Sequence, residues 1–409
     1  MYRLPGLTEI SGALRGRIPI VQDVVGLDPE SEVLYVRASK GELLSFDLET
    51  GHLDTVALNV EHATLGPDGT VYAVDTKHRV TSVSKRARLA WPTALAAAPR
   101  ELFGGSDQRL VAVVAQDPPK LVVAAADQPP ASRPLVPGDV AATRWADLIA
   151  VASDSGVTLV DPLGRRTSTF IPLADHPRTL AFSPSGHRVY VARRGGIGLA
   201  VIDRFSREEA DGVALPGPAS SLRLDPLGRW LVARPPLGDT AWVVDLPIKA
   251  LTGAIATSWH VDLPAITTDG SLLVRQGNDV VAYRPDSLTE TGRAVGGAGD
   301  LWVPTDWLPR GTPHTSVADA TPGQQAVPAT DSVGPEGPLY VQVSVSQNQS
   351  WSQEMAQQLI HAGLPARVLP PASADEGYRV VLGPYPTRGQ AEDIGRKLGR
   401  PFWIYQPGQ

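Results

Sequence analysis

Short apolar runs recur along residues 20–310 at an almost constant spacing. Each run is four residues long and almost entirely apolar, and each starts 38 to 42 residues after the previous one. The runs are Val33-Leu34-Tyr35-Val36, Val71-Tyr72-Ala73-Val74, Leu110-Val111-Ala112-Val113, Leu148-Ile149-Ala150-Val151, Val189-Tyr190-Val191-Ala192, Trp230-Leu231-Val232-Ala233 and Leu272-Leu273-Val274-Arg275. Short continuous apolar runs bounded by turn residues are typical of buried strands, and the region shows no good amphipathic helix.

Turn residues precede most of these runs, and a further strand pattern follows each. The clearest turns are at 66–69, 183–186 and 225–228, and several following strands end at an aspartate. A repeat of about forty residues with several strands is the signature of a propeller blade, and a ring of blades leaves no long exposed sheet edges. We therefore predict an all-β seven-bladed β-propeller. The segment Ile10–Ile18 is expected to supply an outer strand to the last blade.

A different pattern begins near residue 337. Apolar–polar alternation from Tyr340 is followed by helical spacing and a short strand pattern, and the same order repeats from Tyr378 to Tyr405. Two strand–helix–strand units predict a small α+β domain of βαββαβ order, the ferredoxin-like split arrangement. It has a four-stranded antiparallel sheet with two helices on one face. The other sheet face is left open.

The two patterned regions are separated by a segment without periodicity. Prolines and glycines are frequent there among Thr, Ala, Gln and Asp, which is typical of a flexible linker. The 409 residues are also too many for one ordinary domain. We therefore expect a propeller over 1–310, a linker over 311–336 and a second domain over 337–409.

The C-terminal stretch resembles the SPOR domain, a family that binds septal peptidoglycan whose stem peptides have been removed. The resemblance rests on Tyr-Val-Gln-Val from Tyr340, on Ala-Gly-Leu-Pro-Ala-Arg-Val after the first helix, and on Tyr-Arg-Val-Val-Leu-Gly-Pro-Tyr from Tyr378. The first motif departs from the family pattern, because Ser344 stands where the family usually has glycine. Ser-Pro-Ser-Gly-His-Arg-Val-Tyr-Val at 183–191 similarly resembles the YVTN-type and WD-repeat-like propellers, which suggests a fold and no particular activity.

Strand alternation sorts the C-terminal residues between the two sheet faces. Tyr340, Gln342, Ser344, Arg379 and Val381 are expected on the open face, and we predict that they form a glycan-binding site. By the resemblance, Gln342 and Arg379 match positions that face the glycan. Glutamine donates to and accepts from sugar hydroxyl and acetamido groups, and arginine presents five donors. An ordinary solvated sheet face is the alternative.

Composition narrows the classes of function. The absence of cysteine excludes disulfides, thiolate metal sites and thiolate nucleophiles, and a net charge of −6 makes nucleic acid an unexpected partner. No apolar run reaches the ~18–20 residues of a transmembrane segment, and the first thirty residues contain no signal-peptide core. The SPOR resemblance nevertheless implies export. We expect a periplasmic or cell-envelope protein whose export signal or lipid anchor was removed before residue 1.

Catalytic motifs are not evident. The eight histidines include no i,i+4 pair and no His-Glu-x-x-His, and there is no Gly-x-Ser-x-Gly. We therefore predict no catalytic residues, no metal and no cofactor. A metal site assembled from separate blade loops is the alternative.

Three functional hypotheses follow. The first is a non-enzymatic envelope protein, in which the SPOR domain binds denuded peptidoglycan glycan strands and the propeller is a platform for an unknown protein partner or ligand, in cell division or wall remodelling. The second is a propeller enzyme that acts on wall or small-molecule substrates and is targeted by the SPOR domain. The third treats the SPOR-like module as a protein–protein adaptor, because its first motif is altered at Ser344.

Overall fold

The structure is a computed structural model that describes residues 1–10, 21–28, 31–84, 88–105, 108–196, 198–204, 206–305, 339–346, 349–361, 364–371, 377–397 and 402–406. The chain forms two compact units. One comprises most of Met1–Arg310 and is called the N-terminal unit below, and the other, the C-terminal unit, lies in Gly311–Gln409. The predicted linker, residues 311–336, lies outside the described residues.

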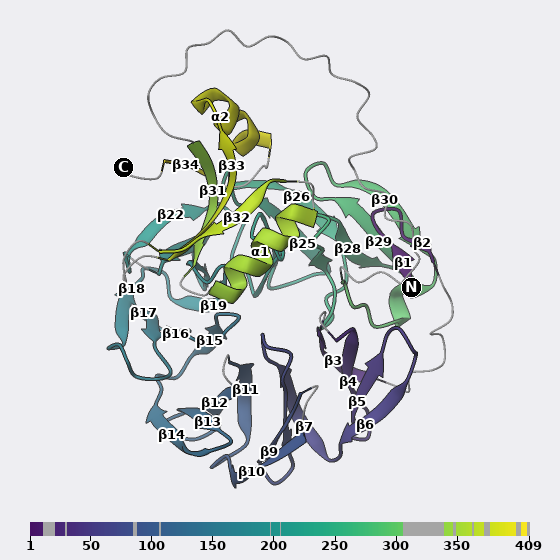
Figure 1. The fold of residues 1–409 in the computed structure, drawn as a ribbon, viewed down its shortest axis with the longest axis vertical. Coiled ribbons are helices and arrows are strands. Elements are labelled where there is room, and N and C mark those ends of the chain that lie inside the picture. The colour runs from purple at the N-terminus through teal and green to yellow at the C-terminus, as the bar shows by residue number, and fades with distance from the viewer. Residues whose placement is uncertain are drawn as a thin grey trace. The chain divides into compact units, whose positions relative to one another are not determined.

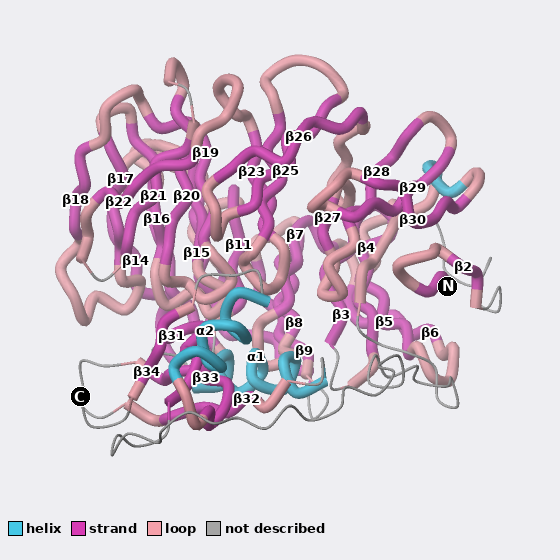
Figure 2. Tube along the Cα trace, turned by 90° about the horizontal axis from the view of Figure 1, so that it is seen from above, coloured by secondary structure: helices cyan, strands magenta, loops and turns pink. Residues whose placement is uncertain are grey.

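Within the described residues, the N-terminal unit contains seven four-stranded antiparallel sheets, each formed by four consecutive strands, and a two-stranded hairpin. The sheets stand side by side around a ring (Figure 1), and the described part of this unit consists of strands, connecting loops and a short helix, η1 (Gly297–Gly299) (Figure 2). The predicted fold class, an all-β seven-bladed propeller followed by a small α+β unit, is confirmed.

Each blade takes its strands in chain order. The first three blades are β3 (Val21–Asp28), β4 (Val33–Ala38), β5 (Leu43–Asp47) and β6 (Leu53–Ala57); β7 (Val60–Leu65), β8 (Val71–Asp75), β9 (Arg79–Val83) and β10 (Arg88–Ala94); and β11 (Pro99–Gly104), β12 (Arg109–Val114), β13 (Lys120–Ala125) and β14 (Gln128–Pro134). The fourth and fifth are β15 (Asp139–Ala142), β16 (Ile149–Ser153), β17 (Gly156–Val160) and β18 (Thr169–Pro172); and β19 (Pro177–Phe182), β20 (Arg188–Arg193), β21 (Leu199–Asp203) and β22 (Glu209–Val213). The last two are β23 (Ser221–Leu224), β24 (Trp230–Arg234), β25 (Thr240–Asp245) and β26 (Ala250–Ala256); and β27 (Ala265–Ile266), β28 (Leu272–Gln276), β29 (Asp279–Arg284) and β30 (Thr289–Ala294). First strands of neighbouring sheets contact one another between β3, β7 and β11 and between β15, β19, β23 and β27.

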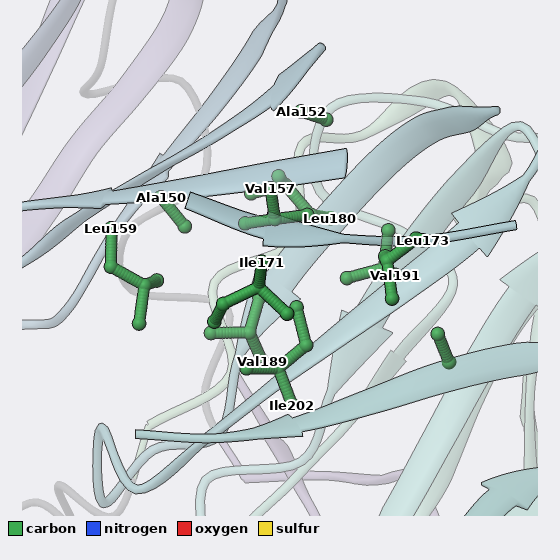
Figure 3. Close-up of a cluster of buried hydrophobic side chains, with 11 residues drawn as sticks. Ala150, Ala152, Val157, Leu159, Ile171, Leu173, Leu180, Val189, Val191 and Ile202 are labelled. Atoms are coloured by element: carbon green, nitrogen blue, oxygen red, sulfur yellow. The ribbon is translucent and has the colours of Figure 1, made fainter. Parts of the chain in front are cut away.

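The seven apolar runs found in the sequence are the second strands of the seven blades. Both faces of such a strand are covered, because the blades on either side pack against its sheet. The cluster between the fourth and fifth blades shows this, with Ala150 and Ala152 of β16 near Val189 and Val191 of β20 (Figure 3). Burying one such valine or leucine side chain stabilises the fold by about 1.5–3 kcal/mol.

The predicted turns join the first and second strands of several blades. In the fifth blade the Gly186 amide donates to the Ser183 carbonyl, and in the seventh the Gly270 amide donates to the Thr267 carbonyl. Both glycines have positive φ, 64° and 84°. This left-handed conformation is strained for residues with a Cβ, which explains why glycine recurs at the end of the turn.

The N-terminus lies against the last blade. The hairpin of β1 (Tyr2–Arg3) and β2 (Thr8–Glu9) lies beside β30. Residues 11–18 of the predicted Ile10–Ile18 strand lie outside the described residues. The Thr291 hydroxyl donates to the Pro5 carbonyl at 3.1 Å, and the Tyr2 ring stacks on Trp302.

A buried ion pair ties the last blade to the segment that follows it. Arg275 of β28 donates to both carboxylate oxygens of Asp262, at 2.8 and 2.7 Å, and each side chain is only 4% exposed. Arg275 also donates to the carbonyls of Ala298 and Asp300, and the Trp302 amide donates to Asp262. Both charges are therefore well satisfied, as a buried ion pair requires.

The C-terminal unit has one four-stranded antiparallel sheet and two helices. Its elements are β31 (Leu339–Ser346), α1 (Gln349–His361), β32 (Ala366–Leu369), β33 (Tyr378–Tyr385), α2 (Arg388–Lys397) and β34 (Trp403–Tyr405). The spatial strand order is β32-β33-β31-β34, which is the split βαβ arrangement predicted from the sequence.

The helices are amphipathic, as their spacing predicts. Met355 and Leu359 of α1 and Ala391 of α2 are buried, whereas Ile360 of α1 is 45% exposed. The Gln390 amide donates to the Thr387 hydroxyl, which therefore caps the start of α2. In the part of the chain that the structure describes, neither helix has the length and hydropathy to span a membrane.

Candidate functional site

A side-chain hydrogen bond and the alternation of β33 distinguish the two faces of the C-terminal sheet. The Tyr378 hydroxyl donates to Gln349 at the start of α1, and Val380 and Leu382 lie two and four residues further along the same strand. These alternate residues therefore face the helices. Arg379 and Val381, which lie between them in sequence, belong to the opposite face, called the open face below.

The strand register places most of the predicted site on the open face. Gln342 of β31 pairs with Val381 of β33, and the Gln342 side-chain oxygen accepts a hydrogen bond from Arg379 at 3.0 Å. Tyr340 lies two residues before Gln342 and shares its face. Four predicted residues, Tyr340, Gln342, Arg379 and Val381, thus lie together.

The prediction that Ser344 lies on the open face is wrong. A β-bulge between Gln342 and Ser344 shifts the register, so that Ser344 pairs with Val380, a helix-facing residue. Val345 pairs with Arg379 and takes the place on the open face. One extra residue reverses the alternation of everything after it. Ser344 does not have a positive φ, so serine replaces the family's glycine there without backbone strain.

Two arginines lie across the open face. Arg367 of β32 reaches over β33, and its guanidinium carbon lies 4.3 Å from the ring centre of Tyr340 on β31. Arg379 of β33 reaches over β31 in the same way, and its guanidinium carbon lies 5.0 Å from the ring centre of Tyr405 on β34. Such cation–π contacts contribute about 0.5–1 kcal/mol at exposed sites.

These arrangements explain the burial of the predicted apolar residues. Arg367 pairs with Val381 in the sheet and continues to Tyr340, so its side chain passes over the middle of the face. Val381 is fully buried and Tyr340 is 6% exposed. Val381 therefore lies beneath the arginines and is not accessible from the open face.

Sequence reasoning missed three residues of the open face: Arg367, Trp403 and Tyr405. Gln342 pairs with Trp403 and Tyr340 pairs with Tyr405, so these β34 side chains continue the same rows. Trp403 is 72% exposed, unusually high for a tryptophan. The alternation along 366–369 and 402–405 indicates which of these residues share a sheet face. It does not indicate that this face is the one that carries Gln342, because that depends on how the strands pair.

The backbone conformation and close packing at Gly383 explain why the Gly-Pro-Tyr motif has glycine at this position. Gly383 has φ of 119°, and a Cβ added there would lie 3.0 Å from the Tyr385 ring and 3.2 Å from the Leu339 carbonyl. A side chain would therefore displace the end of β33 from β31. The register of β31 next to Tyr340 depends on this glycine.

The family comparison assigns this unit. The model of the SPOR domain matches residues 335–401. These residues form a SPOR domain. The resemblance expected from the sequence motifs is confirmed, and the match begins two residues before the predicted boundary at 337.

Comparison with solved structures supports the propeller fold of the region before the SPOR domain. A structure of the dihydro-heme d1 dehydrogenase NirN in complex with DHE aligns with a TM-score of 0.50 and 16% identity, over 68% of this chain and 66% of that one. AztD from Citrobacter koseri aligns with a TM-score of 0.49 and 10% identity, over 67% of this chain and 86% of that one. At 16% identity, the alignment with NirN shows a shared fold and nothing about activity. No curated protein was found to be similar in sequence.

Across the described ranges, no group of three or more His, Asp or Glu side chains is placed to hold a metal ion. The open face of the SPOR domain is the candidate functional site.

Proposed function

We propose that this chain is a non-enzymatic protein of the bacterial cell envelope whose SPOR domain binds peptidoglycan glycan strands through its open face. The observation that carries the proposal is the row formed by Gln342 and Arg379 beside Tyr340, Tyr405 and the exposed Trp403. Sugars present hydroxyl and acetamido groups around apolar ring faces. Amide and guanidinium groups beside flat aromatic rings match both features.

The hydrogen bond from Arg379 to Gln342 orients both side chains before a ligand arrives. Gln342 accepts through its side-chain oxygen, and its amide nitrogen then points away from the arginine with two donors. Preorganised polar groups lose less side-chain entropy on binding. The pair is therefore suited to a ligand that accepts hydrogen bonds, such as a sugar acetamido oxygen.

The family match supports a location in the cell envelope, in the periplasm, and a role at sites of division or wall remodelling, where denuded glycan strands arise. In this proposal the propeller is the interaction platform for a protein partner. The two parts, 1–310 and 337–409, fold independently and are tethered by 311–336, whose Pro- and Gly-rich composition supports a linker.

Co-sedimentation of the full chain with purified sacculi tests the proposal. We expect binding to increase when the sacculi are first treated with an amidase, which removes stem peptides and exposes glycan. A Gln342→Ala variant should bind the treated sacculi less, because it loses a directed hydrogen bond. Equal binding to treated and untreated sacculi, or binding to neither, would overturn the glycan proposal in favour of the protein-adaptor hypothesis.

A further inference from the structure

The charged residues on the strands of the SPOR domain are all of one sign. The four strands contain two arginines, Arg367 and Arg379, and no Asp, Glu, Lys or His. Register and contacts place both arginines on the open face. A neutral saccharide needs hydrogen bonds but no net charge. Two positive charges without an acidic residue on these strands therefore favour a ligand that carries an anion.

Arg367 is held in a way that leaves its donors available. Its guanidinium lies against the Tyr340 ring, and the side chain is exposed. Among the described residues, no carboxylate forms an ion pair with it. Stacking on an aromatic ring occupies one flat face of the guanidinium and leaves the N–H groups in its plane free to donate. Two parallel N–H groups fit the two oxygens of a carboxylate.

The proposed glycan ligand carries a carboxylate only after its stem peptide is removed. In intact peptidoglycan, the lactyl carboxyl of N-acetylmuramic acid is an amide with the first residue of the stem peptide. An amidase adds water across that bond, leaving a carboxylate on the sugar and an amine on the released peptide. Denuded strands therefore carry one new anion at each muramic acid residue.

We infer that Arg367, supported by Tyr340, forms a carboxylate subsite on the open face that recognises the free lactyl group of denuded strands. This inference rests on the proposed glycan binding, and it names the chemical group of the glycan that the domain recognises. On this inference, the domain prefers denuded strands because the arginine attracts the carboxylate that the amidase has exposed. Arg379 lies on the same face and adds to the positive field. The exposed Trp403 side chain contacts the sugar rings.

Chemical conversion of the lactyl carboxylates tests the subsite without altering the protein. Soluble strands released from amidase-treated sacculi are divided, and one half is converted to primary amides with carbodiimide and ammonia. The amide has the shape of the carboxylate but no charge. We expect the full chain to bind the amidated strands about ten- to a hundred-fold more weakly, because a hydrogen-bonded charge pair is lost.

A protein variant then assigns the effect to a residue. Arg367→Gln should lose most of the difference between the two kinds of strand, because only the field of Arg379 remains, whereas Arg388→Gln, at an exposed arginine of α2, should keep the wild-type difference. Released stem peptides, which also carry carboxylates, should not displace the strands. Displacement by these peptides, or the full wild-type difference retained in Arg367→Gln, would overturn the assignment.

The two levels of the proposal fail differently. If the wild-type chain binds carboxylate and amide strands equally well, the carboxylate subsite is refuted and glycan binding stands. If it binds neither kind, the proposed function itself fails.

Discussion

Replacing Asp262 by alanine is expected to destabilise the propeller by about 3–5 kcal/mol, because it leaves the charge of Arg275 buried without its partner. Both side chains are 4% exposed, so water cannot replace the lost carboxylate without rearrangement of the blade. Calorimetry of the full chain measures the effect. If the two parts fold independently, as proposed, the propeller transition moves to lower temperature while the SPOR transition stays in place.

An exposed pair in the same blade provides the control. Arg284 and Asp286 also form an ion pair, but both are well exposed, and Asp286→Ala should change stability little because solvent screens such pairs. Equal effects of the two substitutions would contradict the role of burial. A single transition that shifts as a whole in Asp262→Ala would contradict independent folding.

The Asp262 contribution should also depend on pH. Burial alone would raise the pKa of Asp262, but hydrogen bonds from Arg275 and the Trp302 amide outweigh it and lower the pKa below its ordinary value. A lowered folded-state pKa stabilises the protein above the unfolded value of about 3.9, and this is lost as pH falls through the folded-state pKa. The stability difference between wild type and Asp262→Ala should therefore shrink below about pH 4.

Arg379→Ala is expected to weaken binding of denuded glycan by about ten- to a hundred-fold. The substitution removes a charged donor, which typically contributes about 1.5–3 kcal/mol, and releases Gln342 from its orienting hydrogen bond. It also uncovers the Tyr405 ring. The dissociation constant of the full chain for soluble denuded strands is the quantity to measure.

Arg388→Ala is the matched control for this substitution, since it removes the same charge from an exposed position on α2. An equal loss of affinity in both variants would show that only net charge matters. Unchanged affinity in Arg379→Ala would remove this residue from the site.

The number and positions of the blades could be predicted from the strands that are buried on both faces. The second strands, such as β20 and β24, each contain four consecutive buried apolar residues because sheets pack on each side of them, and the spacing of these runs gives the number of blades. The first strand of the last blade, Ala265–Ile266, is two residues long and has no pattern to detect. Its place follows from packing between blades, which the local sequence does not encode.

The site was predictable only as far as alternation holds. Tyr340 and Gln342 precede the bulge and lie on the predicted face, whereas Ser344 follows it and does not. Arg367 and Trp403 join the site through pairing between strands that are distant in sequence. Such register depends on the whole sheet, so these residues became evident from the structure.

The most direct measurement of the central claim is hydroxyl-radical footprinting of the full chain with and without soluble denuded glycan strands. Trp403 is 72% exposed on the open face, Ile360 is 45% exposed on α1, and Leu237 is 87% exposed on the propeller. The account predicts that glycan lowers oxidation at Trp403 and leaves Ile360 and Leu237 unchanged. Bound glycan that protects Ile360 or Leu237 while Trp403 stays fully reactive would contradict it.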